Sequence, residues 1–114
     1  MLAKTNRFHG YNSLNFAYKQ GKAVRGSQLT LRFVLNEKRS AYRVAVVVSK
    51  KVSKSAVIRN RIRRRVYEAV RLQSAAIDKP YDIIIMVYAE EVATMPSEAL
   101  QKAVTGLLQK ASVI

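Results

Sequence analysis

Residues 59–71 read Arg-Asn-Arg-Ile-Arg-Arg-Arg-Val-Tyr-Glu-Ala-Val-Arg, a stretch with six arginines and one acid. Its apolar residues, Ile62 and Val66 among them, still recur at helical spacing. We therefore predict a helix that begins near Ser55, an acceptable N-cap, and continues to about Gln73. The apolar residues fall on one side of this helix and most of the arginines on the other. Because like charges repel one another on that side, a polyanion such as RNA or DNA would relieve the repulsion.

Positive charge is concentrated in the first part of the chain. Residues 1–71 contain 18 Lys or Arg against two acids, whereas residues 72–114 contain three lysines against five acids. The formal net charge of the 114-residue chain is +14. A charge of this size concerns partners rather than fold, and it favours nucleic acid over an anionic membrane surface.

The composition also bounds the compartment and the domain count. No apolar run approaches the roughly 20 residues that span a bilayer, and Lys4, Arg7 and His9 interrupt any signal-peptide core. We therefore expect a cytoplasmic protein with no membrane partner. The chain has no cysteine, which excludes a disulfide framework and a thiolate metal site. Nearly half of the residues are apolar, which suffices for a single domain over residues 1–114.

The segments before the basic helix predict one short helix and two or three strands. Residues 11–20 predict a helix that stops at Gly21. Residues 28–35 alternate between apolar and mostly polar positions, as a half-buried strand does. The valine-rich run at residues 42–48 fits a second strand that pairs with the first as a hairpin, with Val24 in a short edge strand before them.

Two further elements follow the basic helix. Residues 82–88 form an almost continuous apolar run, which predicts a central strand covered on both faces or nearly so. The last segment predicts an amphipathic helix that closes the core. Its apolar residues step at i, i+3, i+4, i+7, i+8 and i+11, and they are Leu100, Ala103, Val104, Leu107, Leu108 and Ala111.

Several short motifs occur in a characteristic order, namely Ser49-Lys50-Lys51, Ala56-Val57, Arg59-Asn60-Arg61-Ile62-Arg63-Arg64 and Glu68-Ala69. In this order and spacing they resemble the signature of the bacterial ribonuclease P protein component. An Arg7-Phe8 start and the order of the predicted elements match that family over most of the chain. The family is the small protein subunit of a ribonucleoprotein whose large RNA cuts precursor tRNA to give the mature 5′ end.

The resemblance implies the fold and the partners. The fold would be α+β, in the order αβββαβα, with a mixed sheet similar to a domain of certain ribosomal proteins. A left-handed crossover is also implied, although right-handed βαβ crossovers dominate in general. The chain would act as an accessory subunit of the endonuclease, with catalysis in the RNA. Its partners would be ribonuclease P RNA and precursor tRNA, without an obligate protein partner.

The first RNA-contacting surface that the resemblance implies is the basic helix with the segment leading into it. Arginine suits this role because a planar guanidinium bridges two phosphate oxygens and also stacks on an exposed base. The alternative is a solvated charged face, but such faces normally mix signs. The predicted contacts to the catalytic RNA are Lys50, Lys51, Lys54, Arg59, Asn60, Arg61, Arg63, Arg64, Arg65 and Arg71.

The second implied surface is a cleft for the single-stranded 5′ leader of the precursor, between the first helix and the sheet. Family members often carry aromatic residues where this chain has Leu14 and Arg32, so we expect less base stacking and more electrostatic contact. Tyr18 is the main stacking candidate, and its alternative interpretation is an aromatic side chain packed at the edge of the core. The predicted cleft residues are Leu14, Tyr18, Thr30 and Arg32, with Phe8 and Phe16 as further candidates.

The chain lacks the residues of a protein nuclease. It has one histidine, His9, seven scattered acids and no phosphate-cradling glycine loop. We therefore expect the protein to act indirectly, by lowering the repulsion between two RNAs and gripping the leader. No cofactor is expected in the protein itself, and magnesium is expected through the RNA subunit, whereas a metal on the protein stays open. The alternatives are a ribosomal or RNA-chaperone protein without a role in tRNA cleavage, and a DNA-compacting protein.

Overall fold

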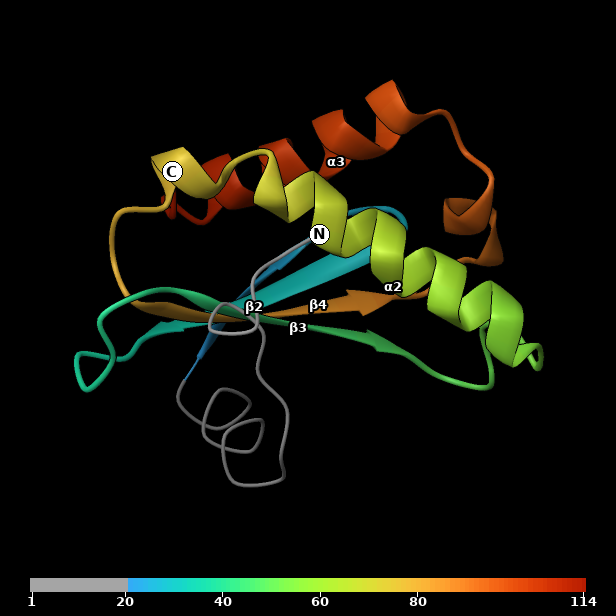
Figure 1. Cartoon of the computed structure of the whole chain (residues 1–114), viewed down its shortest axis with the longest axis horizontal. Coiled ribbons are helices and arrows are strands. Elements are labelled where there is room, and N and C mark those ends of the chain that lie inside the picture. Colours follow the sequence, from blue (N-terminus) through green and yellow to red (C-terminus); the bar gives the residue numbers. More distant parts are fainter. Residues whose placement is uncertain (1–20) are drawn as a thin grey trace.

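The structure, a computed structural model, describes residues 21–114, so the helix expected at residues 11–20 lies outside the described residues. Two helices cover one face of a four-stranded sheet (Figure 1). The strands are β1 (Lys22–Arg25), β2 (Leu29–Leu35), β3 (Arg43–Val48) and β4 (Tyr81–Val87). The helices are α2 (Ala56–Arg71) and α3 (Ser97–Lys110), and the short 3-10 turns are η2 (Ser74–Ala76) and η3 (Glu90–Ala93).

The order of the strands differs from the hairpin that the sequence predicted. The sheet has the order β1-β2-β4-β3, in which β4 is antiparallel to β2 and parallel to β3. The predicted pairing of residues 28–35 with residues 42–48 is therefore wrong, because β4 lies between these two strands. Four consecutive residues of β4 are buried, and such a strand needs a neighbour on each edge and cover on both faces. The predictions of a central strand here and of an edge strand at Val24 are confirmed.

A crossover through α2 connects the parallel neighbours β3 and β4. In Figure 1, α2 lies above the sheet and β3 lies in front of β4, while both strands point the same way. This is the left-handed arrangement. The crossover therefore follows the family expectation rather than the general preference for right-handed connections.

The main core lies between the sheet and the two helices. Leu31 of β2 and Ile85 of β4 face Val66 of α2 and Val104 of α3 in one cluster, and all four side chains are fully buried. Burial of an apolar side chain of this kind contributes about 1.5–3 kcal/mol. The apolar face predicted for the last helix is confirmed, since its buried residues are Leu100, Val104, Leu107 and Leu108, followed by Ala111.

At one end of the sheet, a buried carboxylate on β4 binds side chains from β3 and from the residue that follows β2. Asp82 of β4 accepts hydrogen bonds from Nε and Nη2 of Arg43, at 2.9 and 2.8 Å, and from Nδ2 of Asn36, at 2.9 Å. Asn36 directly follows β2, and Arg43 begins β3. The side chain of Asp82 therefore binds both neighbours of β4, and these partners compensate for the removal of its charge from water.

Side chains of α2 reach the outer edge of β3. The hydroxyl oxygen of Tyr67 accepts a hydrogen bond from the backbone N–H of Val46 at 3.3 Å, and Nη2 of Arg63 lies 3.5 Å from the carbonyl oxygen of Val48. Backbone groups that have no strand partner at this edge are in this way satisfied by the helix. The opposite edge strand, β1, is four residues long.

Candidate RNA interface

The N-terminal end of α2 is fixed by local hydrogen bonds. Oγ of Ser55 accepts a hydrogen bond from the backbone N–H of Ile58 at 3.3 Å, which confirms the predicted N-cap. Oγ of the buried Ser53 accepts from the backbone N–H of Ser55 at 3.2 Å. Nη1 of Arg59 donates to the carbonyl oxygen of Ser53 at 2.8 Å. Arg59 therefore turns back along the helix margin and holds the loop that leads into α2.

Arg61 and Arg64 lie on the solvent-exposed side of α2. Both side chains are exposed, and within residues 21–114 neither has a hydrogen bond or an ion pair with another residue. They are three positions apart, so they lie on the same side of α2. Lys50, Lys51 and Lys54 are also exposed, in the segment before the helix. A phosphate backbone would meet these five cations without breaking a contact inside the described part of the protein.

Asn60 and Arg63 form a hydrogen-bonded pair next to Arg61 and Arg64. Nη1 of Arg63 donates a hydrogen bond to Oδ1 of Asn60 at 2.8 Å, while Nη2 points toward the edge of β3. The two residues are one helical turn apart. Asn60 therefore orients the guanidinium of Arg63, and its amide nitrogen stays available as a donor.

Arg65 points toward a different part of the protein. Nη1 donates a hydrogen bond to the carbonyl oxygen of Val92 at 2.6 Å, and Nη2 donates to the carbonyl oxygen of Met95. The guanidinium is half-buried between α2 and the connection from η3 to α3. Its hydrogen bonds are therefore used within the protein, and RNA contact by Arg65 stays a prediction.

Arg71 is paired with Glu68 at the C-terminal end of α2. Nε of Arg71 lies 2.9 Å from Oε2 of Glu68, and the two side chains are 42% and 43% exposed. The hydrogen bonds and the charge of Arg71 lower the pKa of Glu68 to about 2, and Glu68 raises the pKa of Arg71. Because water screens an exposed pair, it adds little to stability. Its main effect is to neutralise positive charge at this end of the helix.

Thr30 and Arg32 lie on the sheet face that is turned away from the two helices. Thr30 is opposite Met86 in the register of β2 and β4, and Arg32 is opposite Ile84. Thr30 is buried, whereas Arg32 is half-buried. Around them, the buried side chains of Ala45 and Ile84 pack with Val34, Val47 and Met86 in a second apolar cluster. The other predicted cleft residues, Phe8, Leu14, Phe16 and Tyr18, lie outside the described residues.

Two residues of this face were not identified from the sequence. Arg25 of β1 is exposed and lies opposite Thr30 in the sheet register. Tyr88 is 57% exposed, and its hydroxyl oxygen lies 3.9 Å from Sδ of Met86. The alternation of β4 contains the signal for Tyr88, because every second residue from Ile84 through Met86 shares one face. The face therefore offers a cation and an exposed ring to a ligand.

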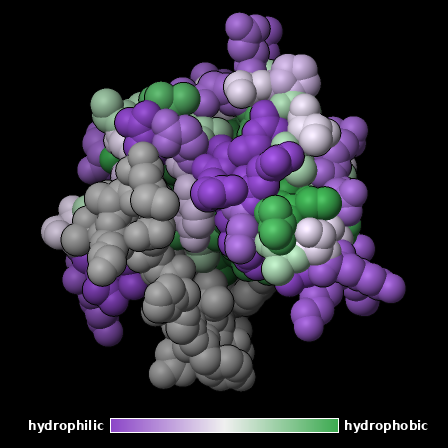
Figure 2. Space-filling model, turned by 45° about the vertical axis from the view of Figure 1, so that its right-hand side comes forward, coloured by the Kyte–Doolittle hydropathy of each residue, from purple (hydrophilic) through white to green (hydrophobic). Residues whose placement is uncertain are grey.

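One face of the described surface is largely hydrophilic. Figure 2 shows polar side chains across the face in view, with a small apolar patch beside them.

Within residues 21–114, no three His, Cys, Asp or Glu side chains gather where they could hold a metal ion. Magnesium through the RNA subunit stays a prediction. None of the described helices has the length and apolar character needed to cross a membrane.

Comparison with known proteins gives a consistent result. The family model described as Ribonuclease P matches residues 2–112. The ribonuclease P protein component of Pseudanabaena sp. is 31% identical over 115 residues, which cover 100% of this chain and 97% of the relative. That of Chloroflexus aurantiacus is 40% identical over 77 residues, which cover 68% of this chain and 56% of the relative.

The similarity extends to solved structures. The RNase P protein of Staphylococcus aureus superimposes with a TM-score of 0.83 at 26% identity, covering 95% of this chain and 96% of that one. The protein from Thermotoga maritima shares the fold, with a TM-score of 0.76 at 24% identity and coverage of 85% and 89%. The chain therefore belongs to the ribonuclease P protein family.

Proposed function

We propose that this subunit of ribonuclease P, the ribonucleoprotein endonuclease of tRNA processing, contacts the catalytic RNA through α2. The contact surface, which we call the α2 cationic face, consists of Lys50, Lys51, Lys54, Arg61 and Arg64. One observation carries the proposal: Arg61 and Arg64 are exposed and have no partner in the described part of the chain. Arg59, Asn60, Arg63 and Arg71 flank the face and shape it through the contacts described above.

The chemical contribution of this face is charge neutralisation. Each phosphate that a lysine or arginine contacts releases condensed counterions from the RNA, which favours association at low salt. Two RNAs that approach the same protein surface also repel one another less. The protein therefore raises the affinity between catalytic RNA and substrate, while the cleavage chemistry belongs to the RNA.

Two of the described acids, Asp82 and Glu68, are already engaged by other side chains of the protein. A general base must reach the proton that it removes. Asp82 is fully buried and holds three hydrogen bonds, and Glu68 is engaged by Arg71. Neither carboxylate is placed to act on a bound phosphodiester.

For the leader of the precursor, we propose the sheet face that carries Thr30 and Arg32. Arg25 and Tyr88 extend this face with a second cation and an exposed aromatic ring. Stacking on a ring beside cations binds unpaired bases with little sequence preference. Such binding suits a substrate class whose members share a 5′ extension but differ in its sequence.

The test of the α2 cationic face is the variant Arg61→Ala with Arg64→Ala. Loss of two phosphate contacts should weaken assembly with a bacterial ribonuclease P RNA by about 10- to 100-fold and reduce the slope of log affinity against log salt by roughly 1.5. The thermal unfolding midpoint should stay unchanged, because both side chains are exposed. Cleavage of 5′-labelled precursor tRNA at low magnesium measures the functional consequence.

The matched control is Arg39→Ala with Lys79→Ala, which removes the same charge from exposed positions outside α2. This variant should retain most of the affinity. Equal losses in both variants would mean that only net charge matters. An unchanged affinity in the α2 variant would show that the RNA binds elsewhere.

A further inference from the structure

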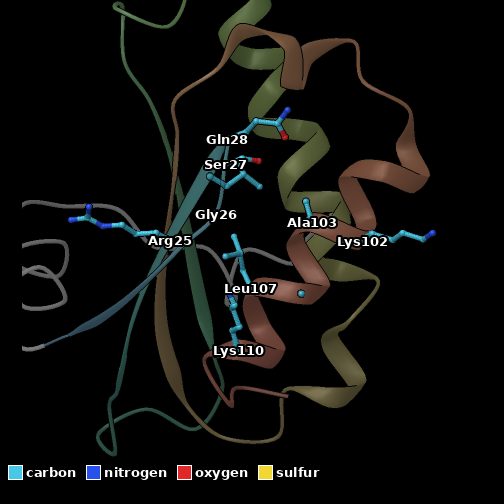
Figure 3. A pocket seen from close by; sticks show the side chains of 10 residues that line it. Arg25, Gly26, Ser27, Gln28, Lys102, Ala103, Leu107 and Lys110 are labelled. Carbon is cyan, nitrogen blue, oxygen red and sulfur yellow. The ribbon is translucent and has the colours of Figure 1, made fainter.

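A groove lies between α3 and the turn that joins β1 to β2 (Figure 3). Gly26 and Leu107 meet at its floor, where the position of a Cβ atom on Gly26 would lie 3.4 Å from Cδ2 of Leu107. The groove is at the β1 edge of the sheet, and α2 closes the opposite edge at β3. It is therefore separate from the α2 cationic face, and it shares only Arg25 with the sheet face proposed for the leader.

Cations line this groove, and no acidic residue of the described chain does. Lys102 and Lys110 are two of the three lysines in residues 72–114, a part of the chain that is otherwise acidic. Arg25 contributes a third cation from β1. Figure 3 shows Lys110 along the groove, while Arg25 and Lys102 extend outward on its two sides. Exposed side chains change rotamer within nanoseconds, so the head groups of Lys102 and Lys110 can both reach an anion bound in the groove.

Gly106 lies between the two lysines, one helical turn from each. Glycine inside a helix is less stable than alanine, because it loses more backbone freedom on folding. A Cβ atom at Gly106 would meet nothing within 4 Å, so packing within the protein does not require glycine here. Bare helix backbone is useful where a ligand must approach closely. The glycine is therefore better explained by an external partner than by the fold.

We propose that this groove, which we call the α3 groove, binds a single-stranded RNA segment. The phosphates would contact Lys102 and Lys110, with Arg25 at the margin of the groove, and a ribose or base would cover Gly106 and Leu107. An RNA strand fits better than an acidic peptide, because its phosphates can pair with the lysines while a ribose or base packs on the apolar side chains of Ala103 and Leu107. The proposal rests on the proposed function in that its ligand is RNA, and it adds a third contact surface to the α2 cationic face and the sheet face.

The direct test is a titration of the full-length, ¹⁵N-labelled chain with a 12-nucleotide oligouridylate, followed by amide chemical shifts. We expect shifts at Gly26 and Gly106, together with shifts at Arg61 and Arg64. Shifts confined to α2 would overturn the α3 groove and leave the proposed function intact. An absence of shifts at both surfaces would overturn both proposals. Stronger groove shifts with an oligoglutamate peptide would overturn the RNA assignment in favour of an acidic protein segment.

The variant Gly106→Ala separates stability from binding. Alanine should raise the thermal midpoint by about 2–5 °C and should weaken oligouridylate binding, read at the Gly26 amide, about threefold. A raised midpoint with unchanged binding would overturn the role of Gly106 and with it the proposal. If the thermal midpoint of Gly106→Ala rises, unfolding of the variant cannot explain weaker binding.

The cations are tested by Lys102→Gln with Lys110→Gln. Binding at the Gly26 amide should weaken about fivefold, and the salt slope should fall by roughly 1.4, the value for two phosphate contacts to a single strand. The control Lys38→Gln with Lys79→Gln removes two exposed charges outside the groove and should leave binding at this amide within twofold. Equal effects of the two variants would overturn a local site.

Discussion

Asp82 links β4 to side chains on both of its neighbouring strands' sides. Its carboxylate is fully buried, and it holds Asn36 and Arg43 on the two sides of β4. In Asp82→Ala the guanidinium of Arg43, which is 11% exposed, would lose its counter-charge in a dry site. We expect a loss of about 3–5 kcal/mol in the free energy of unfolding, measured by urea denaturation. Asp78→Ala, at an exposed position, is the control and should change stability by less than about 0.5 kcal/mol; equal losses would contradict a special role for Asp82.

Residue-level features differ in how far the sequence predicts them. The exposure of Arg61 and Arg64 follows from the helical period, and the cap at Ser55 follows from local chemistry. The partners of Asp82 are 46 and 39 residues away, so no local pattern identifies them. The same holds for Arg65, whose carbonyl partners are 27 and 30 residues away. Local periodicity predicts which side of a helix or strand a side chain faces, but the tertiary fold determines which residues it contacts.

At the scale of elements, α2 has two roles, RNA contact and attachment to the rest of the fold, and two neighbouring arginines divide these roles between them. Arg64 is exposed, whereas Arg65 ties the helix to the carbonyl oxygens of Val92 and Met95. Arg65→Ala should lower the free energy of unfolding by about 1.5–3 kcal/mol, because two charge-assisted hydrogen bonds are lost. Arg64→Ala should leave the free energy of unfolding nearly unchanged and weaken RNA binding. Urea denaturation and RNA titration of both variants measure the contrast.

The reverse pattern would contradict this assignment. If Arg65→Ala weakened RNA binding at full stability, Arg65 would be a direct RNA contact, as the sequence predicted. The affinity must therefore be measured well below the unfolding transition of each variant.

The periodicity of apolar residues predicts the helices and strands themselves, but it does not predict the order of the strands in the sheet. Both helices occur where the 3.6-residue spacing places them, at Ala56–Arg71 and Ser97–Lys110. The strands at residues 29–35 and 43–48 also occur, yet they are not neighbours. Proximity in sequence favoured a hairpin, whereas burial of β4 on both faces required a central position. A strand's apolar pattern predicts how deeply it is buried and leaves its partners open.

For the whole molecule, the net charge of +14 sets how stability responds to salt. Repulsion among so many cations destabilises the compact state. Raising sodium chloride from 0.1 to 1 M shortens the screening length from about 10 to about 3 Å. The midpoint of urea unfolding should therefore rise, while affinity for RNA falls over the same range. A midpoint that falls with salt would mean that attractive ion pairs outweigh the repulsion.

Charge alone does not identify the function of the whole molecule. Ribosomal, chaperone and DNA-compacting proteins would share the basic composition and the steep salt dependence. Family membership over residues 2–112 decides in favour of a ribonuclease P subunit. The order of the motifs around residues 49–69, rather than their charge, carried that information in the sequence.

Copies of a cationic protein become crowded along an RNA molecule, where they meet more often than in free solution. An open strand edge would then pair with the edge of a second copy and seed a growing aggregate. Tyr67 and Arg63 occupy the β3 edge, and β1 offers four residues that include Lys22 and Arg25. The helix α2, which would bring copies of the protein together on RNA, thus also blocks the pairing of their sheets at the β3 edge.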